Sequence, residues 1–235
     1  MDAGQRWALE VFGPYGRQIR ERIPALVQAE HWAMVDAQEA SGHRSRGVYG
    51  QAWRGLIEKF EEFGRIPGGS LVSPGRAPYK IPVINGVALF PWRYGDGAAG
   101  PAAEVAFATS DARVALFNLP PTPVQPELDL ELPAPSLSDD EREVIAEFIS
   151  EDGYTRRVVV VAVACSMAGI QDVRWGEARL GLDGFLEFVD QEVLLRPGVA
   201  RPVALTDESL TFEAGEPPRK HLRLQGEAAG EVGDA

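Results

Sequence analysis

The side chains best suited to chemistry in this sequence form a basic and aromatic cluster near its N-terminal end. Arginine beside aromatic rings can contact single-stranded nucleic acid, and the same combination is frequent at the energetic centres of protein interfaces. A third interpretation is structural, with Trp53 in the core and the arginines in a loop before a helix. We select the cluster as the candidate partner-binding site. Its members are Arg44, Arg46, Tyr49, Trp53 and Arg54, together with Arg17 and Arg20 on a preceding helix.

Nucleophilic catalysis has one weak candidate, Ser166. It lies in Ala164–Ala168, directly after an apolar run, and distantly matches the small-x-Ser-x-small turn of hydrolases. Its base would have to be His221, because no other histidine follows it in the chain. The segment after the turn has the pattern of a strand and not of the required helix. We therefore interpret Ser166 as part of a tight turn and Cys165 as a small buried residue, and name no catalytic residue.

Phosphate-binding motifs are incomplete or missing. Residues 95–100, GDGAAG, have the spacing of dinucleotide-binding glycines, but Pro101 follows where that motif needs a helix. We interpret the segment as a loop. No lysine follows a glycine, which excludes a P-loop, and no acid stands two residues before a lysine, as a common nuclease arrangement requires.

Metal and cofactor sites also lack a signature. His31 and His43 are twelve residues apart and form no HExxH pair, and no DxDxDG calcium loop occurs. The single cysteine excludes a cysteine-rich zinc site. The sequence therefore predicts neither a metal nor a cofactor.

Charge is distributed unevenly along the chain. The net charge is -12, to which residues 1–118 contribute +1 and residues 119–235 contribute -13. An acidic half repels nucleic acid and attracts basic partners, although net charge can also serve solubility alone. We predict a non-catalytic binding or regulatory protein, a subunit of a larger assembly, whose acidic half contacts another protein with a basic surface. The alternative is a nucleic-acid-acting protein, binding or nuclease-like, that holds the strand through its N-terminal half.

No membrane or secretory segment is predicted. The longest apolar run, Val158–Cys165, has eight residues, far below the roughly 20 that a membrane helix needs. The first residues, MDAGQRWALEVFG, contain neither a basic leader nor an apolar stretch of signal-peptide length. We expect a cytoplasmic protein with no membrane partner.

Two helices are expected to position the basic cluster. Apolar residues at helical spacing predict the first helix, which Pro24 kinks or ends and which stops by Ser41-Gly42. Apolar positions at steps of three and four predict the second helix over residues 49–63, with Gly64 as its C-cap.

An antiparallel meander is expected next. Residues 67–78 have the composition of a loop, and Asn85-Gly86 then predicts a type I′ turn that pairs Ile84 with Val87. Prolines within the flanking strands indicate exposed strand edges at Pro82 and Pro91. Two further strands are predicted, over residues 103–109 and 113–119.

The second half predicts a helix and a second antiparallel sheet. Ser138 and Glu141 have the spacing of a capping box, for a helix that runs to about Ile149. Residues 157–165 have the pattern of a strand buried on both faces, and Asp183-Gly184 indicates a hairpin. One more strand is predicted over residues 202–213.

The predicted fold class is therefore α+β, with N-terminal helices and a β-meander, a proline-rich connection, then a helix and a second antiparallel sheet. Whether the two sheets merge is left open. The expected organisation is a helical and meander segment at 1–118, a proline-rich linker at 119–137, an acidic α+β segment at 138–213 and a disordered acidic tail at 214–235.

Overall fold

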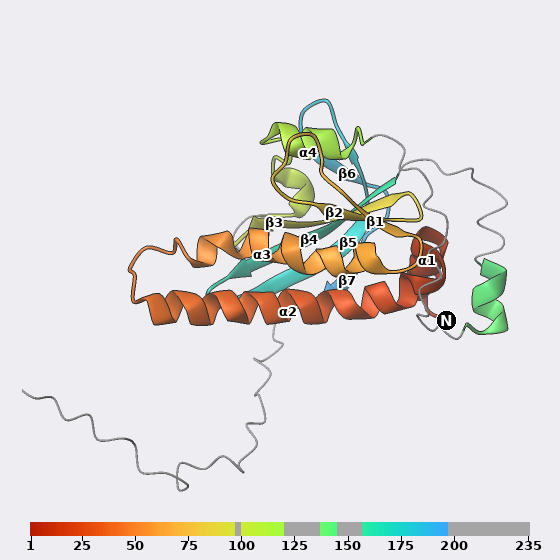
Figure 1. Ribbon diagram of the computed structural model, residues 1–235, viewed down its shortest axis with the longest axis horizontal. Coiled ribbons are helices and arrows are strands. Elements are labelled where there is room, and N and C mark those ends of the chain that lie inside the picture. The colour runs from red at the N-terminus through yellow and green to blue at the C-terminus, as the bar shows by residue number, and fades with distance from the viewer. Residues whose placement is uncertain (97–99, 120–136, 145–156, 197–235) are drawn as a thin grey trace, which may run out of the picture. The chain divides into compact units, whose positions relative to one another are not determined.

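The computed structural model describes residues 1–96, 100–119, 137–144 and 157–196, all within one unit, Met1–Ala200. Its N-terminal part is helical, as predicted. Figure 1 shows α2 and α3 side by side beneath the sheet. No helix in the described ranges combines the length and apolar character needed to cross a membrane. The elements are α1 (Ala3–Phe12), η1 (Gly13–Tyr15), α2 (Gly16–Ser41), η2 (Tyr49–Gln51), α3 (Ala52–Phe60) and η3 (Glu61–Arg65), where η denotes a 3₁₀ turn.

The ends of α2 differ in part from the prediction. Gly42 ends the helix as expected, in the left-handed conformation with φ of 64°. Pro24 does not end it and lies inside it. Proline removes one backbone donor, but Ile19, Ile23 and Val27 on either side are buried in the core. Burial of this apolar face favours an unbroken helix over the local preference of proline.

The segment after α3 also differs from the prediction. Part of the expected loop forms an edge strand, β1 (Gly69–Val72). Gly64 is not a C-cap but lies buried inside η3, where a Cβ would come within 2.5 Å of Leu71 Cδ2. The glycine therefore permits the close approach of η3 to β1, a tertiary contact that local composition does not reveal.

A single seven-stranded sheet joins the two halves of the chain. Its order is β1-β2-β3-β4-β5-β6, and β7 also pairs with β5. All neighbours are antiparallel except β3 and β4, which run parallel. The α+β class is confirmed, and the two expected sheets are one. The remaining strands are β2 (Ile81–Ile84), β3 (Val87–Gly95), β4 (Arg157–Ser166), β5 (Gly169–Leu180), β6 (Leu186–Phe188) and β7 (Glu192–Leu195).

Both faces of the sheet are covered. The helices α1, α2 and α3 pack on one face, around the fully buried Trp175 of β5. On the other face lies α4 (Figure 1), and Phe107, Leu116 and Leu186 are buried in the core there. Because β4 lies between these layers, all its residues from Val158 to Cys165 are buried, as predicted.

The turn at Asn85-Gly86 forms as predicted. Its two φ angles are 48° and 80°, and Ile84 pairs with Val87. The Asn85 side chain also donates a hydrogen bond to the carbonyl of Phe12, at 2.9 Å. This bond fastens the β2–β3 hairpin to the end of α1.

Pro82 and Pro91 are buried on interior strands, so the exposed edges predicted at them are wrong. Pairing of β2 with β3 nevertheless stops at Val83 and Ala88. Because the pairs of a two-residue hairpin alternate, the nitrogen of Pro82 faces β3 and has no hydrogen to donate. Beyond that point β3 runs on to Gly95 with β4 as its paired neighbour, and its other flank is left for side chains from other elements.

The strands predicted over residues 103–109 and 113–119 are wrong. The chain forms η4 (Ala102–Glu104) and α4 (Asp111–Leu116) there. A short apolar segment fits both helical and strand spacing. Here the helix buries Leu116 at its end, and Leu119, beyond the helix, is buried in the same core.

The described part of the second half follows the prediction. The capping box forms, since the Ser138 N–H donates to Glu141 Oε2 at 2.9 Å and the Glu141 N–H donates to Ser138 Oγ at 3.3 Å. Residues 139–144 are helical. Gly184, with φ of 83°, lies in the turn between β5 and β6. The predicted helix end at Ile149, the linker residues 120–136, the strand over 202–213 and the tail at 214–235 lie outside the described residues.

Candidate functional site

A pocket lies along the flank of β3 that β2 leaves unpaired. Its volume is about 430 Å³. Four separate segments build the pocket with their side chains: α3, the approach to β2, the second half of β3 and the start of α4. We call it the arginine–aromatic pocket. Its lining residues are Trp53, Pro78, Tyr79, Phe90, Pro91, Trp92, Arg93, Thr109, Ser110, Ala112 and Arg113.

Aromatic rings form much of the pocket wall. Trp53 and Tyr79 meet edge to face, with ring centroids 6.3 Å apart and planes at 80°. Trp92 is buried and packs at a similar angle on Phe107, at 5.0 Å. Trp53 is 38% exposed, an unusual exposure for so large an apolar side chain. The wall is therefore apolar and fixed at its base, with one ring open to solvent at its rim.

Arg113 supplies one cation to this wall. Its Nη1 donates to Thr109 Oγ1 at 2.7 Å and to the Phe107 carbonyl at 3.3 Å, and its guanidinium carbon lies 5.5 Å from the Phe107 ring centroid. Burial lowers the pKa of Arg113. Within the described ranges no carboxylate forms an ion pair with it.

Arg93 supplies the second cation. Its Nη2 donates to the Cys165 carbonyl at 3.1 Å, and its guanidinium carbon lies 5.3 Å from the ring centroid of Tyr49. Its Nε is buried and has no hydrogen-bond partner among the residues described. No described carboxylate pairs with Arg93 either. A buried donor without an acceptor is uncommon and destabilising, which sets Arg93 apart from an ordinary structural arginine.

A small buried polar group lies behind Arg93. His31 Nδ1 and the Tyr49 hydroxyl are 3.1 Å apart, while His31 Nε2 is buried with no partner in the described part of the chain. Burial, and then the charge of Arg93, lower the pKa of His31, so the imidazole is held neutral. Burial, and then hydrogen bonding to Cys165, raise the pKa of Tyr49. The group supports Arg93 and is itself closed to solvent.

The residues predicted to bind a partner are not brought together. Arg17 Nη1 lies 3.3 Å from Glu141 Oε1, and Arg20 forms an ion pair with Glu192. Arg44 and Arg46 are exposed in the α2–α3 connection, Tyr49 is buried, and Arg54 pairs loosely with Glu58 on the same helix. Trp53 alone belongs to the pocket.

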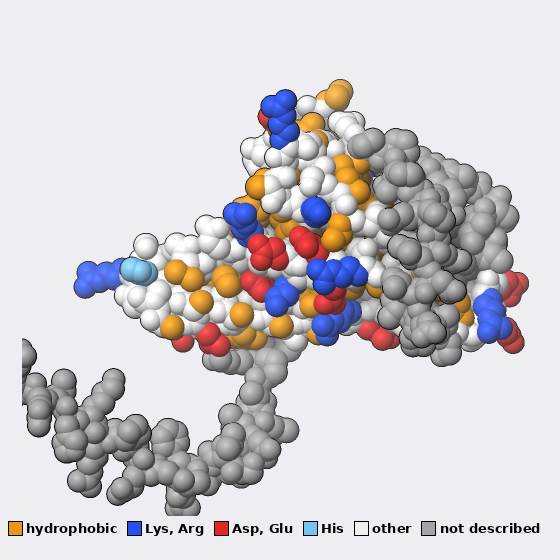
Figure 2. Space-filling view, in the orientation of Figure 1, with side chains coloured by type: hydrophobic (Ala, Val, Ile, Leu, Met, Phe, Trp, Pro, Cys, Tyr) orange, Lys and Arg blue, Asp and Glu red, His pale blue; other side chains and the backbone are white. Residues whose placement is uncertain are grey.

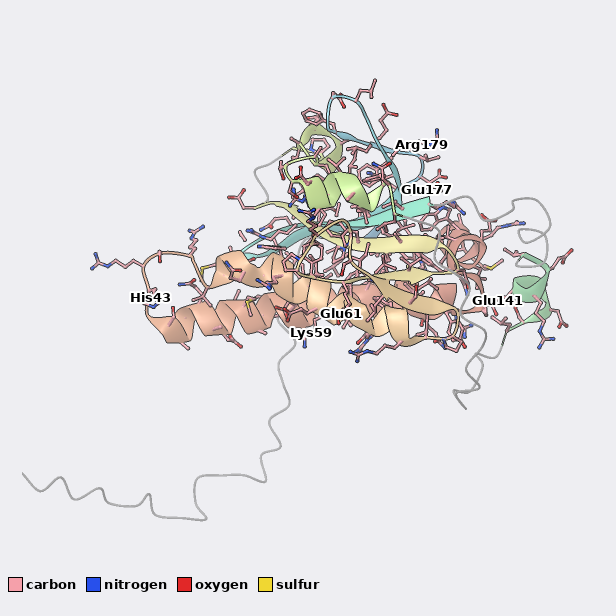
Figure 3. The ribbon with its side chains drawn as sticks, turned by 45° about the horizontal axis from the view of Figure 1, so that its top comes forward. His43, Lys59, Glu61, Glu141, Glu177 and Arg179 are labelled. Atoms are coloured by element: carbon pink, nitrogen blue, oxygen red, sulfur yellow. The ribbon has the colours of Figure 1, made fainter. Side chains whose placement is uncertain are left out.

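The figures show this separation. In Figure 3, His43, next to the exposed arginines of the connection, lies at the opposite end of the helical layer from Glu141, the partner of Arg17. On the face seen in Figure 2, basic and acidic side chains are interspersed over α2 and α3. Arg17 and Arg20 therefore lie apart from the members at positions 44–54, and the role of the whole set in partner binding stays a prediction.

Sequence reasoning missed the residues that define the pocket. Arg93, Arg113, Tyr79 and Trp92 come from three segments with no shared motif, and Arg113 lay in a segment interpreted as a strand. One signal was present. Pro82 and Pro91, which were interpreted as exposed strand edges, lie on neighbouring strands where the pairing of β2 with β3 stops, and Pro91 lines the pocket.

Ser166 lies in the turn between β4 and β5, paired with Gly169, as the structural interpretation predicts. Its hydroxyl accepts hydrogen bonds from Gln171 Nε2 at 3.1 Å and from the Ala168 N–H at 3.3 Å. His221 lies outside the described residues. Within the described ranges, no group of three or more His, Cys, Asp or Glu side chains is placed to hold a metal ion.

Comparisons with known proteins give no further guide, since no family model, no curated protein and no solved structure matches this chain.

Proposed function

We propose that this is a non-catalytic binding protein that holds an anionic ligand with an apolar body in the arginine–aromatic pocket. One observation carries the proposal. Arg93 and Arg113 line a single cavity and have no carboxylate partner in the described part of a chain whose net charge is -12. Partly buried cations are normally paired, because removing a charge from water is unfavourable without a counter-charge. An anionic ligand would supply that counter-charge.

The chemistry of the lining favours binding over catalysis. The residues that line the pocket include no histidine, aspartate, glutamate, lysine or cysteine. General acid–base catalysis needs a group that titrates near working pH, and a serine or threonine nucleophile needs a base beside it. The hydroxyls of Thr109 and Ser110 have no such base in the lining, and Thr109 already accepts a hydrogen bond from Arg113.

Calorimetric titration tests the proposal. The probes are small anions with and without an aromatic ring, such as benzoate and inorganic phosphate. We expect binding that falls at least tenfold in Arg113→Gln, because the variant stays polar but loses the charge and the guanidinium donors. Arg65→Gln, which changes an exposed arginine on η3 outside the pocket, is the matched control and should leave the affinity unchanged. Equal affinities in all three proteins would contradict the proposal.

A second candidate function is contact with a basic protein through the acidic segment after β5. Leu182, at the β5–β6 turn, is fully exposed, and Val189 is 53% exposed. Exposed carboxylates flank them at Asp183, Glu187 and Asp190. Apolar side chains within an acidic surface suit a partner that is basic and apolar.

The two candidates are separable. Leu182→Ser with Val189→Ser should abolish capture of a protein partner and leave ligand binding in the pocket unchanged. Capture that survives this double substitution would remove the second candidate.

A further inference from the structure

We propose that the ligand of the arginine–aromatic pocket is a nucleoside phosphate, with its base against Trp53 and Tyr79 and its phosphate on Arg113. The inference rests on the proposed function and names the chemical class of its ligand.

Arg113 presents an unused edge for an oxyanion. Its hydrogen bonds to the described residues come from Nη1 alone, which fixes one corner of the guanidinium on Thr109 and Phe107. Nε and Nη2 form the opposite edge and have no partner in the described ranges. Two other arginines show what this edge does when an oxyanion is present. Arg20 and Arg157 each donate from Nε and Nη2 to a carboxylate, of Glu192 and Glu177 respectively.

The number of donors favours a phosphate over a carboxylate. Besides Arg113, the pocket is lined by the guanidinium-bearing side chain of Arg93 and by the hydroxyl residues Thr109 and Ser110. A carboxylate offers only two oxygens in one plane, and Glu192 shows their use, since it accepts from Arg20 and from Trp175 Nε1. A terminal phosphate offers three oxygens in a tetrahedral arrangement and can accept from several of these groups together.

The aromatic wall favours a planar ring next to that phosphate. The perpendicular packing of Trp53 and Tyr79 makes two walls of a corner, and the exposure of Trp53 places part of its ring at the rim. Stacking of a nucleobase on such a ring is favourable and tolerates any base. The cavity volume of about 430 Å³ lies in the range of small-molecule sites. Exposed Pro78, Thr109 and Ser110 at the rim leave a path for a sugar, or for a continuing strand, to reach solvent.

Titration calorimetry of the full chain with five probes tests this inference. The probes are adenosine 5′-monophosphate, adenosine, inorganic phosphate, benzoate and a short oligo(A). We expect the mononucleotide to bind at least tenfold more tightly than adenosine, phosphate or benzoate. Adenosine lacks the anion, phosphate lacks the ring, and benzoate offers the arginines only the two oxygens of a carboxylate. Arg113→Gln and Trp53→Leu should each weaken it at least tenfold, and Arg65→Gln should not. Circular dichroism of each variant establishes that it is folded.

The outcomes distinguish a nucleic acid strand from a free nucleotide as the ligand. They also distinguish failure of this inference from failure of the proposed function. Tighter binding of oligo(A), with an affinity that falls as salt rises, identifies a strand as the source, and equal affinities identify the free nucleotide. Benzoate binding as tightly as the mononucleotide, and lost in Arg113→Gln, overturns the nucleotide and keeps the proposed function. Binding of none of the anions overturns both.

Discussion

Arg20 on α2 and Arg113 on α4 are both partly buried arginines, yet their surroundings are opposite. Arg20 donates from Nε to both oxygens of Glu192, at 3.0 and 3.1 Å, and this hydrogen bonding raises its pKa. Arg113 faces aromatic rings, a threonine hydroxyl and a carbonyl, and burial lowers its pKa. The first charge is neutralised by the protein itself, whereas the described residues leave the second without a counter-charge. We infer that Arg20 stabilises the fold and that Arg113 binds a ligand.

The charged groups around Glu192 find their hydrogen-bond partners within the protein itself. The carboxylate also accepts a hydrogen bond from Trp175 Nε1 at 2.9 Å, and a Cβ at Gly4 would come within 2.1 Å of Glu192 Oε1. The carboxylate therefore contacts α1, α2 and β5. Together with the pair of Arg17 and Glu141, this contact joins basic residues of the first half to acids of the second. At these two places, arginines of the first half form ion pairs with glutamates of the second half within the same chain.

Removing the carboxylate of Glu192 is expected to give the largest effect on stability. In Glu192→Ala both the Arg20 guanidinium and the Trp175 indole lose their acceptor, and the free energy of unfolding should fall by about 2–3 kcal/mol. Urea denaturation measures the loss. Glu187→Ala, an exposed carboxylate on β6, is the control and should change the value by less than about 0.5 kcal/mol. A loss no larger than that of the control would remove the structural role of this region.

The second prediction concerns pH and the region behind Arg93. Burial and the charge of Arg93 hold the pKa of His31 below its usual 6.5, so the native state binds this proton less readily than the unfolded chain. Stability from this residue is therefore complete above about pH 6.5 and falls as pH drops below it, by up to about 1.4 kcal/mol per pH unit. In His31→Gln this part of the decline should vanish. Urea denaturation of both proteins across this range is the measurement, and identical slopes would contradict it.

The smallest effect is expected at a paired arginine that is exposed. Arg22 and Glu62 lie 2.9 Å apart, with side chains 55% and 39% exposed. Solvent screens such pairs, so Arg22→Ala should lower the free energy of unfolding by less than about 1 kcal/mol, and added salt should abolish the difference. A loss as large as that in Glu192→Ala would show that pairing alone, without burial, determines the contribution of these arginines.

Most of the fold could be predicted from local signals. The capping box at Ser138, the turn at Asn85-Gly86 and the buried run of β4 each depend on a few neighbouring residues, and each is confirmed. The wrong predictions concern segments whose structure depends on contacts between residues far apart in the sequence. Residues 113–119 fit both the spacing of a helix and the alternation of a strand. The helix α2 continues through Pro24 because its apolar face is buried. The merging of the two sheets depends on the parallel pairing of β3 with β4, which no local pattern contains.

The candidate site was far less accessible to sequence reasoning. The basic and aromatic cluster was chosen for closeness along the chain, but folding buries Tyr49, pairs Arg17 and Arg20 with acids, and leaves Trp53 in the pocket. The two arginines of the pocket lie twenty positions apart, on β3 and α4, without a motif. Their importance rests on missing counter-charges in the described part of the chain, which only coordinates reveal.

The most direct test of the central claim compares Arg20→Met with Arg113→Met in the absence of any ligand. Methionine keeps the apolar part of each side chain and removes the charge. We predict that Arg20→Met lowers the free energy of unfolding by about 2 kcal/mol, because Glu192 loses its cationic partner. We predict that Arg113→Met changes it by less than about 1 kcal/mol in either direction, because no described carboxylate depends on Arg113. Equal losses in the two variants would show that Arg113 is a structural residue and would contradict the account.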